Sequence, residues 1–193
     1  MKGKTLFIHE KLELRLPEME FADSVFELLK YQRNYLEEWL PWASQTKDIN
    51  DCQKQIKSHK LFNIGGQKLI TFIFYNQILV GSIGLVKIIK DNQSAEIGYW
   101  LSQDFQGKGI IVQSCQRIIQ HAFEKMQLNR LEINVASSNL KSVRIPEKLN
   151  FSLEGTLRDG LYIHDKFHNL KKYSLLKREW KKEDNFIKSP FSK

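Results

Sequence analysis

The sequence predicts an α/β (α+β) fold, with a mixed central β-sheet of about seven strands and helices on both of its faces. Segments 69–75 and 78–89 are rich in Ile, Val and Phe, and the Asn76-Gln77 turn between them predicts a hairpin. Apolar residues then recur at helical spacing between Ile111 and Met126. The succession of strands and helices along the chain predicts the mixed sheet.

The remaining elements follow from equally local patterns. Leu12 to Leu16 alternates apolar and charged residues, which indicates a half-buried strand. Acidic residues at the start of segment 18–40 favour a helix there, and Pro41 closes it. Thr46 is a candidate cap for a second helix over 48–61. Further strands are expected at 95–101, 131–135, 151–158 and 167–177, and a short helix at 139–149.

The composition is that of a globular protein. The chain has 193 residues, of which 41% are hydrophobic and 27% are charged. We expect residues 1–180 to form a single domain and residues 181–193 to form a basic tail without fixed structure. The sequence has no apolar run long enough for a membrane helix and no secretory signal pattern at its start. Cys52 and Cys115 are expected to be free thiols, so a cytoplasmic location is predicted.

The net charge of +8 favours an anionic partner, which could be nucleic acid, an acidic protein or a phosphate-rich cofactor. No RNA-recognition motif with paired aromatic residues is present, so direct nucleic-acid binding is not expected. His164 and His168 are four residues apart, but they fall in a predicted strand turn without a third ligand. No metal site is therefore predicted.

A glycine-containing turn, Gln106-Gly107-Lys108-Gly109-Ile110-Ile111, lies between a predicted strand and a predicted helix. Glycine lets the backbone turn tightly and approach a ligand closely. The first N–H groups of a helix have no acceptor inside it, so with the helix dipole they form an anion site that suits a pyrophosphate. The Walker and Rossmann glycine patterns are both missing. A glycine turn that merely begins a helix would have the same sequence.

Several ordered motifs resemble the GNAT acetyltransferase superfamily, and its RimJ/RimL-like branch in particular. The turn resembles the acetyl-CoA signature Gln/Arg-x-x-Gly-x-Gly/Ala, from which Ile111 departs at the last position. Residues 95–100, Ala-Glu-Ile-Gly-Tyr-Trp, resemble the strand before that signature. Asn139-x-x-Ser142 with residues 147–151, and then residues 154–160, resemble two later segments of the branch, so the likeness spans about residues 12–180.

The resemblance implies a GNAT fold in which two neighbouring parallel strands, here 95–101 and 131–135, splay apart around acetyl-CoA. Backbone groups of Trp100, Leu101 and Ser102 would bind the pantetheine arm. The pyrophosphate would be held by the amides of the turn, and the Lys108 side chain could add positive charge. The residues implied in this second role are Gln106, Gly107, Lys108, Gly109, Ile110 and Ile111.

The resemblance also implies attack of an uncharged amine on a thioester, and such an attack needs a group that takes a proton. Glu96 is the candidate base. Strand alternation places Glu96 on the same face as Trp100, beside Gly98, which leaves room. A glutamate that is exposed or ion-paired would fit the same pattern.

The group that assists departure of the thiolate is less defined. Many GNAT enzymes use a tyrosine where this chain has Pro146. Ser142 and Asn139 lie near the expected position of the sulfur, and either could hydrogen-bond the thiol or the pantetheine. Asn139 could also cap the helix that follows it, and the two roles are compatible.

These residues together predict an N-acetyltransferase that moves an acetyl group from acetyl-CoA to a primary amine. The resemblance implies the N-terminal amine of a ribosomal protein as acceptor, and an acidic ribosomal protein would suit the positive net charge better than a polyamine would. A small amine, such as an antibiotic or an amino acid, is the alternative acceptor. A non-catalytic acyl-CoA-binding module is the alternative function. Related folds often form homodimers, and no membrane partner is expected.

Overall fold

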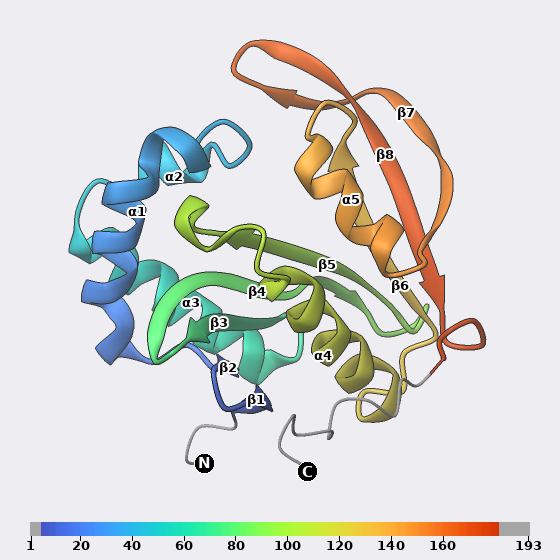
Figure 1. Ribbon diagram of the computed structural model, residues 1–193, viewed down its shortest axis with the longest axis horizontal. Helices are drawn as coiled ribbons and strands as arrows, with labels where there is room; N and C mark the ends of the chain where they lie inside the picture. The colour runs from blue at the N-terminus through green and yellow to red at the C-terminus, as the bar shows by residue number, and fades with distance from the viewer. Residues whose placement is uncertain (1–4, 182–193) are drawn as a thin grey trace.

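The computed structural model describes residues 5–181, which form an eight-stranded mixed sheet with helices on both faces (Figure 1). The strand order is β1-β2-β3-β4-β5-β6-β8-β7, and every neighbouring pair is antiparallel except β5 and β6. The strands are β1 (Leu6–His9), β2 (Leu12–Arg15), β3 (Leu69–Tyr75), β4 (Ile78–Ile89), β5 (Ser94–Leu101), β6 (Arg130–Ala136), β7 (Ser152–Ile163) and β8 (Lys166–Leu176). The helices are α1 (Ala22–Leu36), α2 (Trp42–Gln45), α3 (Ile49–Gly65), α4 (Ile110–Glu124) and α5 (Leu140–Lys148).

The predicted mixed sheet with helices on both faces is confirmed, with three local corrections. The helix expected over 18–40 ends at Leu36, and Pro41 is the N-cap residue of α2 instead of closing that helix. The strand that the sequence did not indicate is β1, which is only four residues long and pairs with β2 at the edge of the sheet. The cap of α3 is Asp48 rather than Thr46, because the Asp48 carboxylate accepts from the Asp51 N–H at 3.0 Å. The Thr46 hydroxyl is buried and donates instead to the carbonyl of Trp42. The predicted tail falls almost entirely in residues 182–193, outside the described part of the chain.

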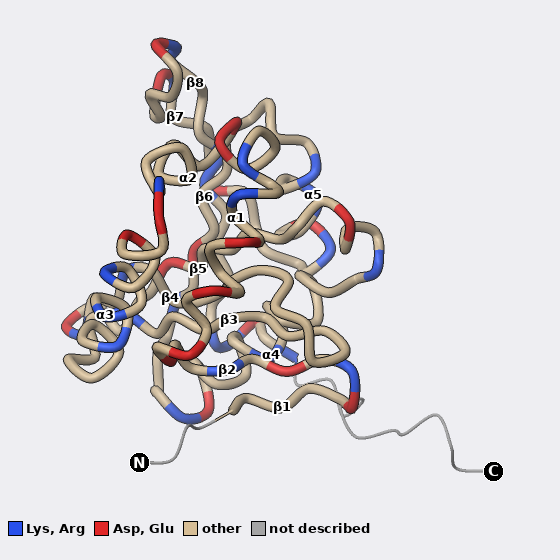
Figure 2. Tube along the Cα trace, turned by 90° about the vertical axis from the view of Figure 1, so that its left-hand side faces the viewer, with Lys and Arg blue, Asp and Glu red and all other residues tan. Residues whose placement is uncertain are grey.

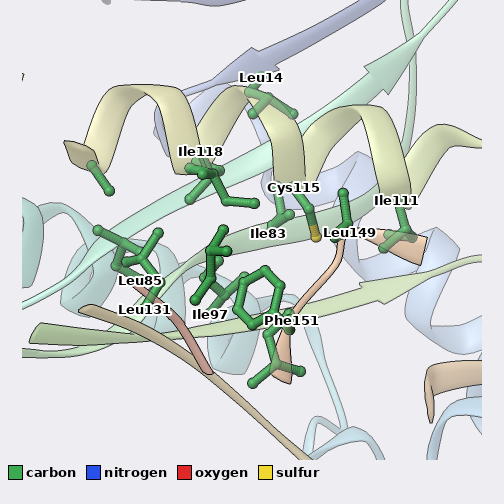
Figure 3. Close-up of a cluster of buried hydrophobic side chains, with 14 of the residues drawn as sticks. Leu14, Ile83, Leu85, Ile97, Ile111, Cys115, Ile118, Leu131, Leu149 and Phe151 are labelled. Carbon is green, nitrogen blue, oxygen red and sulfur yellow. The ribbon is translucent and has the colours of Figure 1, made fainter. Parts of the chain in front are cut away.

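Apolar layers cover the two faces of the sheet. On one face, the apolar side of α4 packs against the central strands, as Figure 3 shows for Ile111, Cys115 and Ile118. On the other face, α1 and α3 form a second cluster with side chains of β3 and β4. Burial raises the pKa of the Cys115 thiol, so this cysteine is a core residue without nucleophilic character. None of the helices within residues 5–181 is long and apolar enough to cross a membrane.

The parallel strands β5 and β6 pair only at their beginnings. Ladder pairs join residues 94–96 to residues 130–132, and beyond Glu96 the two strands diverge. A β-bulge lies at the same level, because Val86 is an extra residue in β4 between the partners of Glu96 and Ile97. A bulge bends its strand and increases the local twist, and β5 leaves β6 at the level of this bulge. Gly98 is required beside the bulge, since a Cβ there would lie 2.8 Å from Val86 Cγ1.

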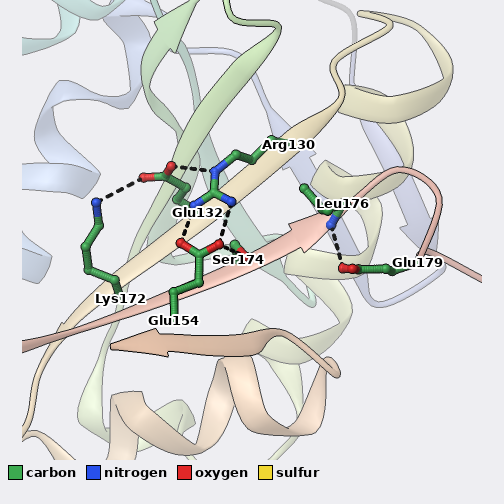
Figure 4. A network of polar contacts seen from close by, with 7 residues as sticks. All are labelled: Arg130, Glu132, Glu154, Lys172, Ser174, Leu176 and Glu179. Atoms are coloured by element: carbon green, nitrogen blue, oxygen red, sulfur yellow. Dashed lines mark hydrogen bonds and ion pairs between the residues drawn. The ribbon is translucent and has the colours of Figure 1, made fainter. Parts of the chain in front are cut away.

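An ion-pair network ties β6 to the β7–β8 hairpin at the closed end of these strands (Figure 4). The Arg130 guanidinium donates to both carboxylate oxygens of Glu154, at 2.6 and 2.5 Å, and to Glu132 at 2.7 Å. The Ser174 hydroxyl also donates to Glu154. The hydrogen bonds from Arg130 and then from Ser174 lower the pKa of Glu154 from 4.5 to about 2.

Substituting Glu154→Gln is expected to lower the unfolding free energy at pH 7 by about 1 kcal/mol, because the pair is bidentate but partly exposed. For a chain of this size the unfolding temperature should fall by about 2–4 °C. Since folding lowers the pKa of Glu154, its contribution is fully present above pH 4.5 and is lost as the pH falls toward 2. The gap between wild type and variant should therefore shrink in that window.

Circular dichroism melts at pH 7 and pH 3 would measure this difference. Glu10→Gln serves as a control, because Glu10 is exposed and makes no ion pair within residues 5–181. A Glu154→Gln variant as stable as wild type at pH 7 would show that the network contributes nothing.

Candidate active site

The divergence of β5 and β6 opens a cleft of about 760 Å³. It is lined by the end of β5, the glycine turn, the first turn of α4, the end of β6 and one side of α5, with α1 at one rim. Ten of the residues singled out from the sequence line it: Glu96, Trp100, Leu101, Gln106, Gly107, Gly109, Ile110, Ile111, Asn139 and Ser142. Residues that are far apart in the sequence are thus brought to one concave surface.

The glycine turn has the backbone conformation that only glycine adopts easily. Gly107 has φ = 74° and Gly109 has φ = 73°, both in the left-handed region. The first backbone hydrogen bond of α4 runs from the Gln113 N–H to the Gly109 carbonyl, at 3.1 Å. The N–H groups of residues 110–112 precede it and have no acceptor within the helix. This end of the cleft can therefore bind an anion.

Ile111, which departs from the family signature, is accommodated by the core. Its side chain is only 9% exposed and packs in the cluster beneath α4, together with Ile110. Ile111 also lines the cleft, and its amide precedes the first backbone hydrogen bond of α4. A bulky residue at this position therefore leaves the amide available.

Gln106 links both rims of the cleft. Its side-chain amide donates to the Tyr35 hydroxyl on α1, and its carbonyl oxygen accepts from the Lys141 ammonium on α5, at 3.1 Å. Lys141, Arg144 and Lys148 are spaced by three and four residues and all line the cleft, so α5 has a basic side toward it. Figure 2 marks Lys and Arg positions along the chain in blue. The three cations of α5 raise the positive potential near the turn.

Glu96 lies in the cleft, and its in-register neighbour on β4 is Lys87. The Glu96 side chain is half-buried, and it makes no hydrogen bond or ion pair with any described residue. Trp100 lies four residues further along β5 on the same face. Its ring packs edge-on against Trp42, with the ring centroids 6.0 Å apart. The space beside Gly98 is taken up by Val86. The Glu96 carboxylate is therefore unpaired within residues 5–181 and lies at the surface of the cleft.

Ser142 is held at the first turn of α5 by two contacts. Its N–H donates to the Asn139 side chain at 3.1 Å, so Asn139 caps the helix. Its hydroxyl lies 3.2 Å from the Tyr99 hydroxyl, which is also 3.3 Å from the Ser142 carbonyl. Burial raises the pKa of Tyr99, which keeps the phenol protonated and able to donate. The Tyr99–Ser142 contact gives the cleft a hydroxyl group at the α5 rim.

Two residues expected in the cleft lie outside its lining. The Ser102 N–H donates to the Val80 carbonyl at 2.8 Å, so this amide faces β4 and is already satisfied. The Lys108 ammonium lies 4.7 Å from the centre of the Phe105 ring, a cation–π contact that directs it away from the turn's amides. Neither side chain lines the cavity.

Three lining residues had no signal in the sequence. Tyr35 is 71 residues from its partner Gln106, and only the packing of α1 brings the two together. Tyr99 reads as a core residue of a strand, and its contact with Ser142 depends on where α5 lies. Asn134 is one polar residue in an alternating strand. Pairings between distant elements of this kind are not encoded in local spacing.

The β7–β8 hairpin approaches the α1–α2 loop at the far rim of the cleft. A ring nitrogen of His164 lies 2.7 Å from the Glu37 carbonyl, and the His168 ring packs against Trp39 at 5.6 Å. Leu161 and Leu170 of the hairpin line the cavity beside them. Within residues 5–181, no group of three His, Cys, Asp or Glu residues could hold a metal ion.

Sequence relatives cover nearly the whole chain. YdaF of Bacillus subtilis, provisionally named as a ribosomal N-acetyltransferase, is 36% identical over 182 residues, which are 93% of this chain and 98% of YdaF. The ribosomal-protein-serine acetyltransferase of Escherichia coli is 28% identical over 171 residues, which are 89% of this chain and 96% of that protein.

Solved structures and a protein family agree with these relatives. The microcin C7 self-immunity acetyltransferase MccE, solved with acetyl-CoA and AMP, superposes with a TM-score of 0.84 at 25% identity, over 88% of this chain and 94% of MccE. Residues 11–152 match the family described as Acetyltransferase (GNAT) domain. The chain therefore belongs to the GNAT family of acetyl-CoA-dependent N-acetyltransferases.

Proposed function

We propose that this chain transfers the acetyl group of acetyl-CoA to the N-terminal amine of a ribosomal protein. The observation that carries the proposal is the position of Glu96, a carboxylate without a partner in a cleft that also holds the glycine turn. The relatives named as ribosomal acetyltransferases suggest the acceptor, because they align over almost their full length. Such an enzyme would act in the cytoplasm, and a homodimer is the expected assembly from the family resemblance.

The donor is expected to lie along the splayed strands. Its pantetheine arm has amide groups that can pair with the facing edges of residues 97–101 and 133–136, which do not pair with each other. The amides of residues 110–112 would hold the pyrophosphate, and the basic side of α5 would add positive charge. Trp100 and Leu101 line the cleft along this path.

The residues of the cleft would then divide the chemistry between them. The bound donor supplies a thioester carbonyl, at which a C–N bond forms and a C–S bond breaks. Glu96 would take the proton that the attacking amine loses, directly or through one water molecule. The Ser142 hydroxyl, held by Tyr99, would donate a hydrogen bond to the departing thiolate. The carboxamide oxygen of Asn139 is engaged as the cap of α5, which leaves its NH₂ group for the pantetheine.

The acceptor is tested by offering the purified protein acetyl-CoA with three amines. These are a peptide with a ribosomal-protein N-terminus, the same peptide with a blocked N-terminus and an internal lysine, and spermidine. We expect the free N-terminus to give a kcat/KM at least tenfold above the other two, measured by release of free thiol. Preference for spermidine or the internal lysine would contradict the proposed acceptor but leave the acetyl transfer standing.

Substituting Glu96→Gln is expected to lower kcat by about 10²–10⁴, because a neutral amide cannot accept the amine proton. The affinity for acetyl-CoA, measured by calorimetry, should remain unchanged. Glu132→Gln is the matched control, since Glu132 is the in-register neighbour of Glu96 but is ion-paired with Arg130. Equal loss in both variants would mean that Glu96 is not the base.

Substituting Gly109→Ala is expected to weaken acetyl-CoA binding about tenfold, because a Cβ strains the left-handed conformation and shifts the amides that follow. Calorimetric titration with acetyl-CoA measures this loss, and ATP is a negative ligand control. Gly155→Ala is the matched substitution outside the site, at a glycine of β7 with open space around it. Unaltered binding by the Gly109→Ala variant would show that the turn does not hold the pyrophosphate.

A further inference from the structure

Asn134 carries an oxygen that no described group satisfies. The residue lies on β6 and lines the cleft. Its Oδ1 atom is buried and has no hydrogen-bond partner within residues 5–181. Buried side-chain oxygens are nearly always paired, because an unpaired one loses its bonds to water and gains nothing in return. An oxygen of this kind inside a substrate cleft indicates a donor group that arrives with a substrate.

Asn134 shares its face of the sheet with Glu96. Glu96 pairs in register with Glu132, and Asn134 is two residues further along the same strand, so all three side chains project from one face. Lys172, which is paired with Asn134 across β6 and β8, reaches Glu132 at 4.0 Å and so lies on this face too. Asn134 is therefore about 6.6 Å beyond the level of Glu96 along the strand.

On this face, the Glu96 carboxylate and the Asn134 oxygen have no hydrogen-bond or ion-pair partner among the described residues. Figure 4 shows Glu132 held between Arg130 and Lys172, at 2.7 and 4.0 Å, so its charge is already compensated. Glu96 has no such partner among the described residues. A ligand on this face thus meets one carboxylate on β5 and one carboxamide oxygen on β6, two residues further along, both without a partner among the described residues.

The Asn134 side chain points out of the plane of the sheet, in which the donor is expected to lie. The backbone edges of β5 and β6 lie in the plane of the sheet, where an extended amide chain would pair with them. Side chains of a strand stand perpendicular to that plane. The α4 and α5 helices cover the opposite face, from which Tyr99 reaches Ser142. The Asn134 side chain can therefore contact a group above the sheet, on the same face as Glu96.

We propose that Asn134 binds the acceptor amine, an inference that rests on the acetyl transfer proposed above. A neutral primary amine has two N–H bonds and one lone pair. One N–H would donate to Asn134 Oδ1, the other would face Glu96, and the lone pair would point to the thioester carbon. After attack, Glu96 takes the proton on its side, while the bond to Asn134 is kept. A secondary amine, such as an N-terminal proline, has only one N–H and cannot satisfy both residues.

The decisive variant is Asn134→Leu, which keeps the branched shape of the side chain but removes the oxygen. The KM for the acceptor peptide should rise at least tenfold, and the KM for acetyl-CoA should stay within twofold. The unfolding temperature should rise by about 2–4 °C, because an unpaired buried oxygen is lost. Asn134→Asp keeps an oxygen that can accept a hydrogen bond. The KM of this variant for the acceptor peptide should lie within about threefold of the wild-type value. Asn134→Ala gives the same comparison if the leucine variant does not fold.

Ser114→Ala is the matched control. Ser114 Oγ is also buried without a partner among the described residues, but it lies in α4 outside the cleft lining. This variant should leave both KM values unchanged. The inference is overturned if Asn134→Leu leaves the acceptor KM unaltered, or if it raises the KM of acetyl-CoA instead. Failure of wild type to acetylate any amine would overturn the proposed function and this inference with it.

Discussion

The site depends on one constraint, which is that β5 and β6 stop pairing after Glu96. The bulge at Val86 in the neighbouring strand β4 lies at the same level, and Gly98 of β5 makes room for the bulged side chain. If the ladder continued, its hydrogen bonds would close the cleft and leave no backbone edge for a bound amide chain. The glycine turn and α4 follow the end of β5 after one short 3-10 turn (Gln103–Phe105), so their position depends on the same divergence.

The cleft concentrates polar groups that the folded chain leaves unpaired. They include the amides at the start of α4, the Asn134 oxygen and the Glu96 carboxylate. Each buried polar group without a partner costs about 1–3 kcal/mol. The two apolar layers on the faces of the sheet offset that cost, and the Arg130 network joins β6 to the hairpin below the point of divergence. The ion pairs that stabilise the fold and the unpaired groups that are available for binding thus lie at different ends of β5 and β6.

Most of the fold could be predicted because its signals are local. The β3–β4 hairpin has two apolar runs around a short turn, and α4 has an apolar stripe of helical period, so neither pattern needed tertiary information. The strand β1 could not be found, since four residues carry too little periodicity and its pairing partner is β2 at the sheet edge. Thr46 has the chemistry of a cap, but burial beside Trp42 commits its hydroxyl elsewhere and leaves the cap to Asp48.

The sequence by itself determined the two glycines with left-handed backbones, the carboxylate at position 96 and the order of the elements. These follow from residue type and spacing, which act over a few residues. Only the tertiary structure decided that Tyr99 meets Ser142, that Tyr35 meets Gln106 and that Asn134 shares the face of Glu96. Those contacts join residues on different elements, so they depend on helix packing and strand register, which no local pattern specifies.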